Sequence, residues 1–162
     1  MKFIEYMKMR IMASYLLSKK GMAREECMDI FTTMIEPRVS ETDGVGHINN
    51  TTLPVWLEAG RLELFKLFTP DLNFKKWKMI ILKTSVEYTA MIYFGHPVEI
   101  KCWIKRLGNS SIELYEEVWQ KGLLCAKAET IYVNFDLEKQ KSEPIPNTIR
   151  EVLKQHMVEV EG

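Results

Sequence analysis

The clearest pattern along the chain is an alternation of apolar and polar residues in its second half. Within Val98–Leu107, an apolar side chain recurs at every second position through Ile104, with mostly charged residues between. Successive side chains of a β-strand point to opposite faces, so this period predicts a half-buried strand. Runs rich in β-branched and aromatic residues, bounded by turn residues, predict three more strands. These are expected at residues 79–93, 112–120 and 123–135.

Short turns separate the four predicted strands and suggest how they pair. The turns are Gly95-His96-Pro97, Gly108-Asn109-Ser110 and Lys121-Gly122, which are typical connections between antiparallel neighbours. We therefore expect a four-strand antiparallel meander. A looser alternation over residues 28–39 predicts one further strand, and Pro37 near its end is typical of a sheet edge or a bulge. The predicted sheet thus has five antiparallel strands.

One long helix is predicted between the first strand and the meander. Residues 49–52 are all cap-forming types and Pro54 is tolerated only in a first turn, so the helix should begin within residues 50–53. Thr69-Pro70-Asp71 should end it. Apolar residues and one glycine recur at helical spacing and indicate which face of the helix is buried. Glu58, Arg61 and Lys66 are expected to lie largely off that face. The buried set is Leu53, Trp56, Leu57, Gly60, Leu64 and Phe68.

The two ends of the chain predict lesser helices. Residues 148–158, capped by Asn147, predict a short C-terminal helix. Residues 1–27 predict an amphipathic helix with a basic edge, too interrupted by charge for a signal peptide or a membrane span. We interpret residues 28–160 as one domain. The N-terminal extension is expected to pack on that domain or on a partner subunit, to stay poorly ordered, or to attach to a membrane surface.

Composition narrows the classes of function. A chain of 162 residues is long enough for one domain with a sizeable core. Its 22 Lys and Arg residues balance 22 Asp and Glu residues, which is not the basic character of a nucleic-acid-binding protein. Three cysteines without a C-x-x-C pair disfavour a disulfide framework or a zinc site. We expect buried, reduced thiols, a cytoplasmic protein, and no metal or cofactor.

The stretch S-E-T-D-G-V-G-H-I-N-N carries the candidate chemistry. It places a carboxylate, Asp43, four residues before an imidazole, His47, with Gly44 and Gly46 between them. Asn49 and Asn50 follow, just before the predicted helix start. An acid, a histidine and a helix N-terminus are thereby brought together, which favours a site for attack on a carbonyl group.

The order of elements and the motifs together resemble a known family. E-T-D-x-x-G-H-x-N-N, followed by W-x-E-x-x-R at Trp56, Glu58 and Arg61, is similar to acyl-CoA thioesterases of the 4-hydroxybenzoyl-CoA thioesterase type. The similarity extends from Asp29 to Pro146. It implies an α+β hotdog fold, in which a five-stranded antiparallel sheet wraps around one long central helix.

The resemblance implies roles for the residues of the motif. The aspartate at position 43 would act on the thioester as a nucleophile or as a general base, and N–H groups just before Pro54 would stabilise the oxyanion. His47 would polarise the carbonyl, orient water or hold the loop. Asn49 and Asn50 would brace the site. A helix carboxylate serves as the base in some relatives, which makes Glu58 a second candidate, although it could equally pair with Arg61 or a lysine.

Substrate and partners are also implied. Lys105, Arg106, Ser110 and Ser111 stand where related enzymes hold the nucleotide or the pantetheine of coenzyme A, although a solvated strand end explains them equally well. The family predicts a homodimer or homotetramer that acts on acyl-CoA. Two alternatives are a thioesterase for acyl-carrier protein, which the neutral composition disfavours, and a non-catalytic module that binds acyl-CoA.

Overall fold

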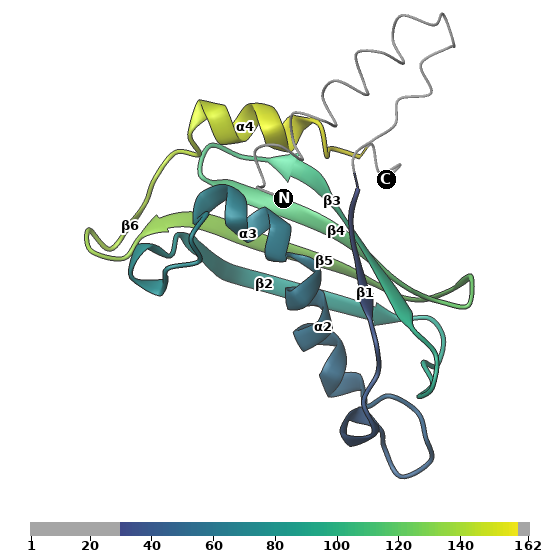
Figure 1. Ribbon diagram of the computed structural model, residues 1–162. Helices are drawn as coiled ribbons and strands as arrows, with labels where there is room; N and C mark the ends of the chain where they lie inside the picture. The colour runs from purple at the N-terminus through teal and green to yellow at the C-terminus, as the bar shows by residue number, and fades with distance from the viewer. Residues whose placement is uncertain (1–29, 159–162) are drawn as a thin grey trace, which may run out of the picture.

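A computed structural model of the protein describes residues 30–158, in which an antiparallel sheet curls around two short helices (Figure 1). The strands are β1 (Phe31–Ile35), β2 (Met79–Tyr88), β3 (Val98–Leu107), β4 (Ser111–Gln120), β5 (Leu123–Asp136) and β6 (Lys141–Ser142). The helices are α2 (Leu53–Gly60), α3 (Leu62–Phe68) and α4 (Asn147–Lys154), and the short 3-10 turns are Val39–Glu41, Asn50–Thr52 and Phe74–Lys76. The α+β class is as predicted. The predicted N-terminal helix lies outside the described residues.

The strand order is β1-β3-β4-β5-β2, with β6 beside β5, so the prediction of a four-strand meander was wrong. Only β3, β4 and β5 follow one another in space. Strand β2 pairs with β5, from Met79 opposite Asn134 to Tyr88 opposite Ala126. The reason is the connection after β2, which is no tight turn. It runs across the end of the sheet, where the Gln120 side chain hydrogen-bonds to the backbone of Tyr93 and His96.

The predicted long central helix is broken into α2 and α3 at Arg61. The predicted start is correct, because a 3-10 turn capped by Asn49 leads into α2 at Leu53, and Pro54 lies in the first turn. The predicted end is also correct, since α3 stops at Phe68. At the break, the Arg61 N–H bonds to the Glu58 carbonyl at 3.0 Å, a 3-10 spacing. The Arg61 side chain consequently turns into the sheet and is only 2% exposed, contrary to its predicted place off the buried face.

Gly60 ends α2 at a point where the helix lies close against the sheet. A Cβ atom at this position would lie 2.7 Å from Cγ2 of Ile100, a fully buried residue of β3. Ile100 is β-branched and therefore stiff, so it could not give way cheaply. Close approach to the sheet thus explains a residue that costs roughly 1 kcal/mol of helix propensity relative to alanine.

The core divides into two clusters, one beneath each central helix. The first surrounds Leu53, Trp56 and Leu57 of α2 and borders the loops at one end of the sheet. The second surrounds Leu64 and Phe65 of α3 and includes Leu153 of α4. Helix α4 begins at Asn147 with Pro146 as its N-cap, so the predicted Asn147 cap was wrong by one residue. It ends at Lys154, and Met157 instead bridges Ile104 of β3.

The two described cysteines, Cys102 and Cys125, are buried free thiols, as predicted. Desolvation by burial raises the pKa of each thiol, which keeps both protonated and unreactive. Among the helices that the structure describes, none combines the length and the apolar character needed to cross a bilayer.

Candidate active site

A pocket of about 530 Å³ opens at the end of the sheet, beside the start of α2. Its walls are the predicted motif loop on one side and the chain that leaves β2 on the other. The lining residues are Asp43, His47, Ile48, Asn49, Asn50, Tyr88, Thr89, Ala90, Met91 and Ile92. The structure therefore brings together the two predicted catalytic residues and the two predicted supporting asparagines.

Asp43 is held by the loop that it begins. Its Oδ1 atom accepts hydrogen bonds from the N–H groups of Val45 and His47, each at 3.0 Å. Its own N–H donates to the His47 carbonyl at 2.7 Å. Gly46 closes the loop with a φ of +83°, a conformation that glycine adopts without strain. One carboxylate oxygen is thus committed to the backbone, and Oδ2 is left for chemistry.

His47 lies beside this second oxygen. Its Nδ1 atom is 3.9 Å from Oδ2 of Asp43, which is ion-pair range but longer than a hydrogen bond. The imidazole ring meets the Tyr93 ring edge-on, with centroids 4.9 Å apart. The two catalytic candidates keep 39% (Asp43) and 28% (His47) of their side-chain surface exposed, so substrate and water can reach both.

The helix start borders the same pocket. Asn49 caps it, with Oδ1 accepting from the Thr51 N–H at 3.0 Å and from the Thr51 hydroxyl at 2.8 Å. The Asn50 carbonyl accepts from the Tyr88 hydroxyl at 2.9 Å, which ties the helix start to the end of β2. The Asn50 N–H meets no acceptor within the part of the chain that the structure describes. It is an available donor at the positive end of the helical segment.

Sequence reasoning missed the groups that fix this arrangement. Glu41 accepts from the Trp56 indole N–H at 3.1 Å and from the Arg38 N–H at 2.7 Å, which joins the motif loop to α2. Glu41 belongs to the motif, but its contact with Trp56, 15 residues further along the chain, cannot be read from the motif itself. Tyr88 and Met91 were missed as pocket residues, because the pocket wall formed by the chain after β2 depends on the unexpected strand order.

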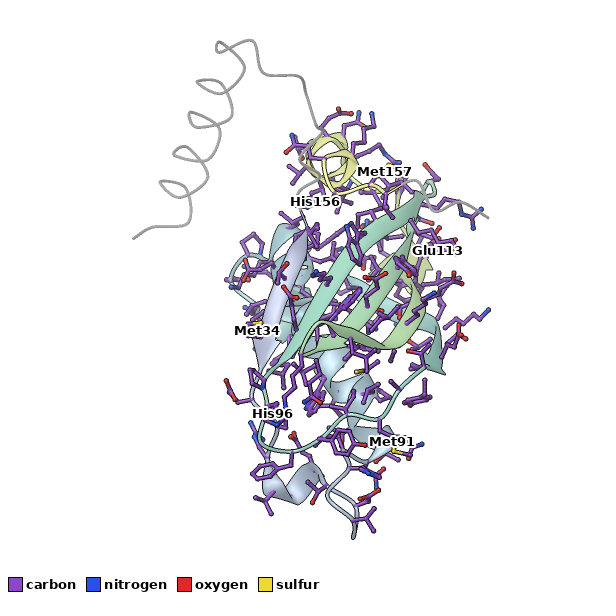
Figure 2. All side chains as sticks on the ribbon, turned by 90° about the vertical axis from the view of Figure 1, so that its right-hand side faces the viewer. Met34, Met91, His96, Glu113, His156 and Met157 are labelled. Carbon is purple, nitrogen blue, oxygen red and sulfur yellow. The ribbon has the colours of Figure 1, made fainter. Side chains whose placement is uncertain are left out.

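Other predicted site residues lie elsewhere in the structure. Glu58 is exposed on α2 and does not line the pocket. Lys105 and Arg106 lie near the end of β3, Ser110 lies in the turn after it, and Ser111 begins β4, all at the far end of the sheet. In Figure 2, Met91 of the pocket lies toward one end of the sheet. Glu113, which pairs with both Lys105 and Arg106, lies toward the other end.

The two cations at the far end are already paired with carboxylates. Lys105 bonds to Glu129 and lies 3.2 Å from Glu113, and the Arg106 Nε lies 3.1 Å from Glu113. Hydrogen bonds to Glu129 and Glu113 raise the pKa of Lys105, so it stays charged. The assignment of coenzyme A to these residues stays a prediction.

A buried ion pair lies deeper, between the helix break and the sheet. Arg61 donates to both carboxylate oxygens of Glu116 at 2.7 Å, to the Tyr132 hydroxyl at 3.0 Å and to the Thr130 hydroxyl at 2.8 Å. Glu116 is fully buried. Burial opposes the guanidinium charge, but the hydrogen bonds and charge of Glu116 outweigh it and raise the pKa of Arg61. This network was not predicted, because Arg61 was expected off the buried face.

Comparison with known proteins decides the family. Residues 37–153 match the model of the thioesterase-like superfamily. The chain belongs to this superfamily. The matched range contains every residue of the pocket, and the curled antiparallel sheet around helices fits the hotdog fold. The resemblance found in the motifs is thus confirmed for the superfamily, and thioester hydrolysis agrees with it as the reaction class.

The chain is similar to proteins whose structures are solved. A predicted thioesterase from Bacillus stearothermophilus is 53% identical, with a TM-score of 0.80 over 82% of this chain and 100% of that one. A thioesterase from Thermus thermophilus, complexed with coenzyme A and zinc, shares the fold at 24% identity and a TM-score of 0.68, over 76% of this chain and 96% of that one. "Putative acyl-CoA thioesterase YneP" of Bacillus subtilis (strain 168) is 25% identical over 70% of this chain and 86% of its own. Within residues 30–158, no group of three His, Cys, Asp or Glu side chains is arranged to hold a metal ion.

Proposed function

We propose that the protein hydrolyses an acyl-CoA thioester to a free acid and coenzyme A in the pocket between the motif loop and the end of β2. The observation that carries the proposal is the pairing of an oriented carboxylate with an available helix-start N–H. Asp43 is fixed through Oδ1, and Asn50, whose N–H meets no acceptor among the described residues, lines the same pocket. The superfamily and the name of the Bacillus subtilis relative support acyl-CoA as the substrate class.

Asp43 serves in one of two ways. As a general base, Oδ2 takes a proton from water, the resulting hydroxide attacks the thioester carbon, the C–S bond breaks, and the thiolate leaves and is protonated. As a nucleophile, a carboxylate oxygen attacks the same carbon and expels the thiolate, and water then hydrolyses the mixed anhydride. In both routes negative charge develops on the thioester oxygen. The Asn50 N–H stabilises that charge, and one such donor is typically worth about 3 kcal/mol of barrier.

The other predicted residues support this chemistry. His47, beside Oδ2 of Asp43, orients the water or polarises the carbonyl. Asn49 fixes the helix start through its cap. Glu58 is the second candidate for the base, and its place outside the pocket favours Asp43.

A thiol-release assay over a panel of acyl-CoA thioesters tests the proposal. We expect turnover of at least one aliphatic or aromatic acyl-CoA, and less turnover of the same acyl group carried by acyl-carrier protein. Thermal unfolding in the presence of each ligand accompanies the assay. If no thioester is hydrolysed but acyl-CoA raises the melting temperature, the protein is a binding module and the proposed reaction is wrong. Preference for the carrier protein would instead favour the second thioesterase class.

We also propose that two copies of the chain pair along β2. This strand is a ten-residue sheet edge, and Ile81, Leu82 and Tyr88 are about half or more exposed on it. A long apolar edge with unpaired backbone groups favours addition of another strand. The pocket includes the end of β2, so pairing there would place a second copy next to the site.

Light scattering after size-exclusion chromatography is expected to give at least a dimer. Leu82→Lys, which introduces a charge on the edge strand, is expected to shift the protein toward the monomer. Leu137→Lys is the matched control, because Leu137 is an exposed leucine in the turn before β6. A wild-type monomer at micromolar concentration would exclude the pairing.

A further inference from the structure

A buried tryptophan lies on the outer face of the sheet, the face that is turned away from α2 and α3 (Figure 1). Trp103 stands in β3 between Cys102 and Ile104, which are fully buried in the core, so its side chain points to the outer face. It is only 8% exposed and belongs to neither core cluster. Its indole N–H is buried without an acceptor among residues 30–158. Because a buried donor normally has a partner, this position indicates a contact that the described residues do not supply.

Trp103 begins a row of aromatic and acidic side chains on this outer face. Its ring centroid lies 5.7 Å from that of Tyr115 on β4, and the Tyr115 hydroxyl donates to Glu117 at 2.9 Å. Within the described part of the chain, no lysine or arginine lies within ion-pair distance of Glu117. Desolvation, the hydrogen bond to Glu117 and the charges of Glu117, Glu129 and Glu87 raise the pKa of Tyr115 to about 12. The outer face thus combines apolar rings with carboxylates that are incompletely paired.

The chain enters the sheet beside this row. The register of β1 pairs Phe31 with Cys102, so the chain that precedes Phe31 approaches the sheet edge next to Trp103. Residues 1–27 contain six Lys and Arg against three Glu, whereas residues 28–162 contain 16 Lys and Arg against 19 Asp and Glu. The N-terminal segment and the domain that follows it therefore carry opposite net charges, which favours contact between them.

The N-terminal segment also has an apolar stripe that fits the row of rings. Four residues share one side of a helix by their spacing: Ile4, Met7, Ile11 and Tyr15. The stripe would be about 16 Å long, enough to cross about three strands of a sheet. Lys8 and Lys19 each follow a stripe residue by one turn and so border the stripe. Residues 20–29 can extend over about 35 Å at most, which lets the helix fold back onto the outer face.

From this arrangement we infer that residues 1–20 dock as a helix on the outer face of their own copy, with the apolar stripe against Trp103 and Tyr115. Lys8 and Lys19 then lie near Glu117 and its neighbouring carboxylates. A hydroxyl or carbonyl group of the segment supplies the acceptor for the Trp103 N–H. The carboxylates of this face would repel anionic lipids, and in a pair of outer faces they would meet their own equivalents, so the basic segment fits better than a membrane or a second copy.

Hydrogen exchange in the full-length protein tests the docking. Amides of residues 4–17 are expected to exchange at least about tenfold more slowly than in the unfolded chain, the scale of burying one large apolar side chain. Ile11→Lys, on the stripe, and Tyr115→Thr, in the row of rings, should each remove most of this protection. Met9→Lys is the matched control, because it adds the same charge on the opposite side of the helix and should leave the protection intact.

Cross-linking with a carbodiimide, which joins an ammonium group to a carboxylate in direct contact, identifies the docking face. In oligomers reassembled from ¹⁵N-labelled and unlabelled copies, we expect Lys8 or Lys19 to be joined within one copy to a carboxylate of the row. These carboxylates are Glu117, Glu129 and Glu87. Thermal unfolding checks that Tyr115→Thr is folded, and if it is not, Ile11→Lys and the cross-links decide.

Four outcomes would overturn the inference. An unprotected segment in the wild type would exclude docking, and protection that survives in folded Tyr115→Thr would exclude this face. Cross-links that join only labelled to unlabelled copies would assign the segment to a partner's sheet. Protection that appears only with vesicles of anionic phospholipid would assign it to a membrane. Light scattering accompanies each variant, since a fall in mass with the loss of protection would show that a second copy covers the outer face.

Discussion

Replacement of Asp43 by asparagine is expected to lower kcat for acyl-CoA hydrolysis by about 10²- to 10⁴-fold, the usual contribution of a general base. Asparagine keeps an Oδ1 atom that can accept the hydrogen bonds from Val45 and His47, so the loop retains its shape. The amide that replaces Oδ2 cannot take a proton or attack a carbonyl. Thiol release under substrate saturation measures the loss, and KM should stay near the wild-type value.

Asp71→Asn provides a closely matched control. Asp71 also accepts a backbone hydrogen bond through Oδ1, from Asn73, but it lies outside the pocket. We expect full activity from this variant. Asp43→Ala should lose as much kcat as Asp43→Asn and also loosen the loop, because both bonds to Oδ1 disappear. Full activity in Asp43→Asn would show that a residue other than Asp43 is the base, and Glu58 would be the next candidate to test.

A single turnover in ¹⁸O-labelled water distinguishes the two roles of Asp43. A general base delivers labelled water to the thioester carbon, so the released acid carries the label. A nucleophile forms an anhydride, and water that opens it at the aspartate carbonyl leaves the label on Asp43. Mass spectrometry of the peptide that contains Asp43 reads the difference directly.

The sequence predicted correctly those elements that are determined by residues near one another in the chain. The alternation in β3 placed Val98, Ile100, Cys102 and Ile104 on one face, and all four are fully buried. The cap residues and Pro54 placed the helix start, which is where the structure has it. The four predicted site residues that line the pocket, Asp43, His47, Asn49 and Asn50, were found for the same reason, because one short loop carries them all.

The errors concern partners that are distant in sequence. The period of β2 shows which face it buries, but it does not show whether its neighbour is β3 or β5. Likewise, the helix break at Arg61 depends on Glu116, 55 residues further along. A signal for that partner was present. Glu116 stands in phase with Ile112, Leu114 and Val118 of β4, all fully buried, and a carboxylate in that position requires a buried cation.

Removal of either partner of the Arg61–Glu116 pair is expected to destabilise the protein strongly. Arg61→Met and Glu116→Leu should each lower the free energy of unfolding by about 3–5 kcal/mol, because each leaves one charge buried without its partner. Urea unfolding followed by circular dichroism measures the loss. Lys66→Met, which breaks an ion pair between partly exposed side chains, is the control and should cost no more than about 1 kcal/mol.

The double variant decides what the pair contributes. With Arg61→Met and Glu116→Leu combined, no uncompensated charge remains, and the unfolding free energy should return to within about 2 kcal/mol of the wild type. Thr130 and Tyr132 would lose the guanidinium as a partner, which accounts for the residual deficit. Additive losses in the double variant would contradict this account. The kcat of the double variant is measured as well. If its stability returns while its kcat stays low, the ion pair contributes to catalysis by holding α2 against the sheet, because the position of α2 sets the position of the Asn50 N–H at the helix start.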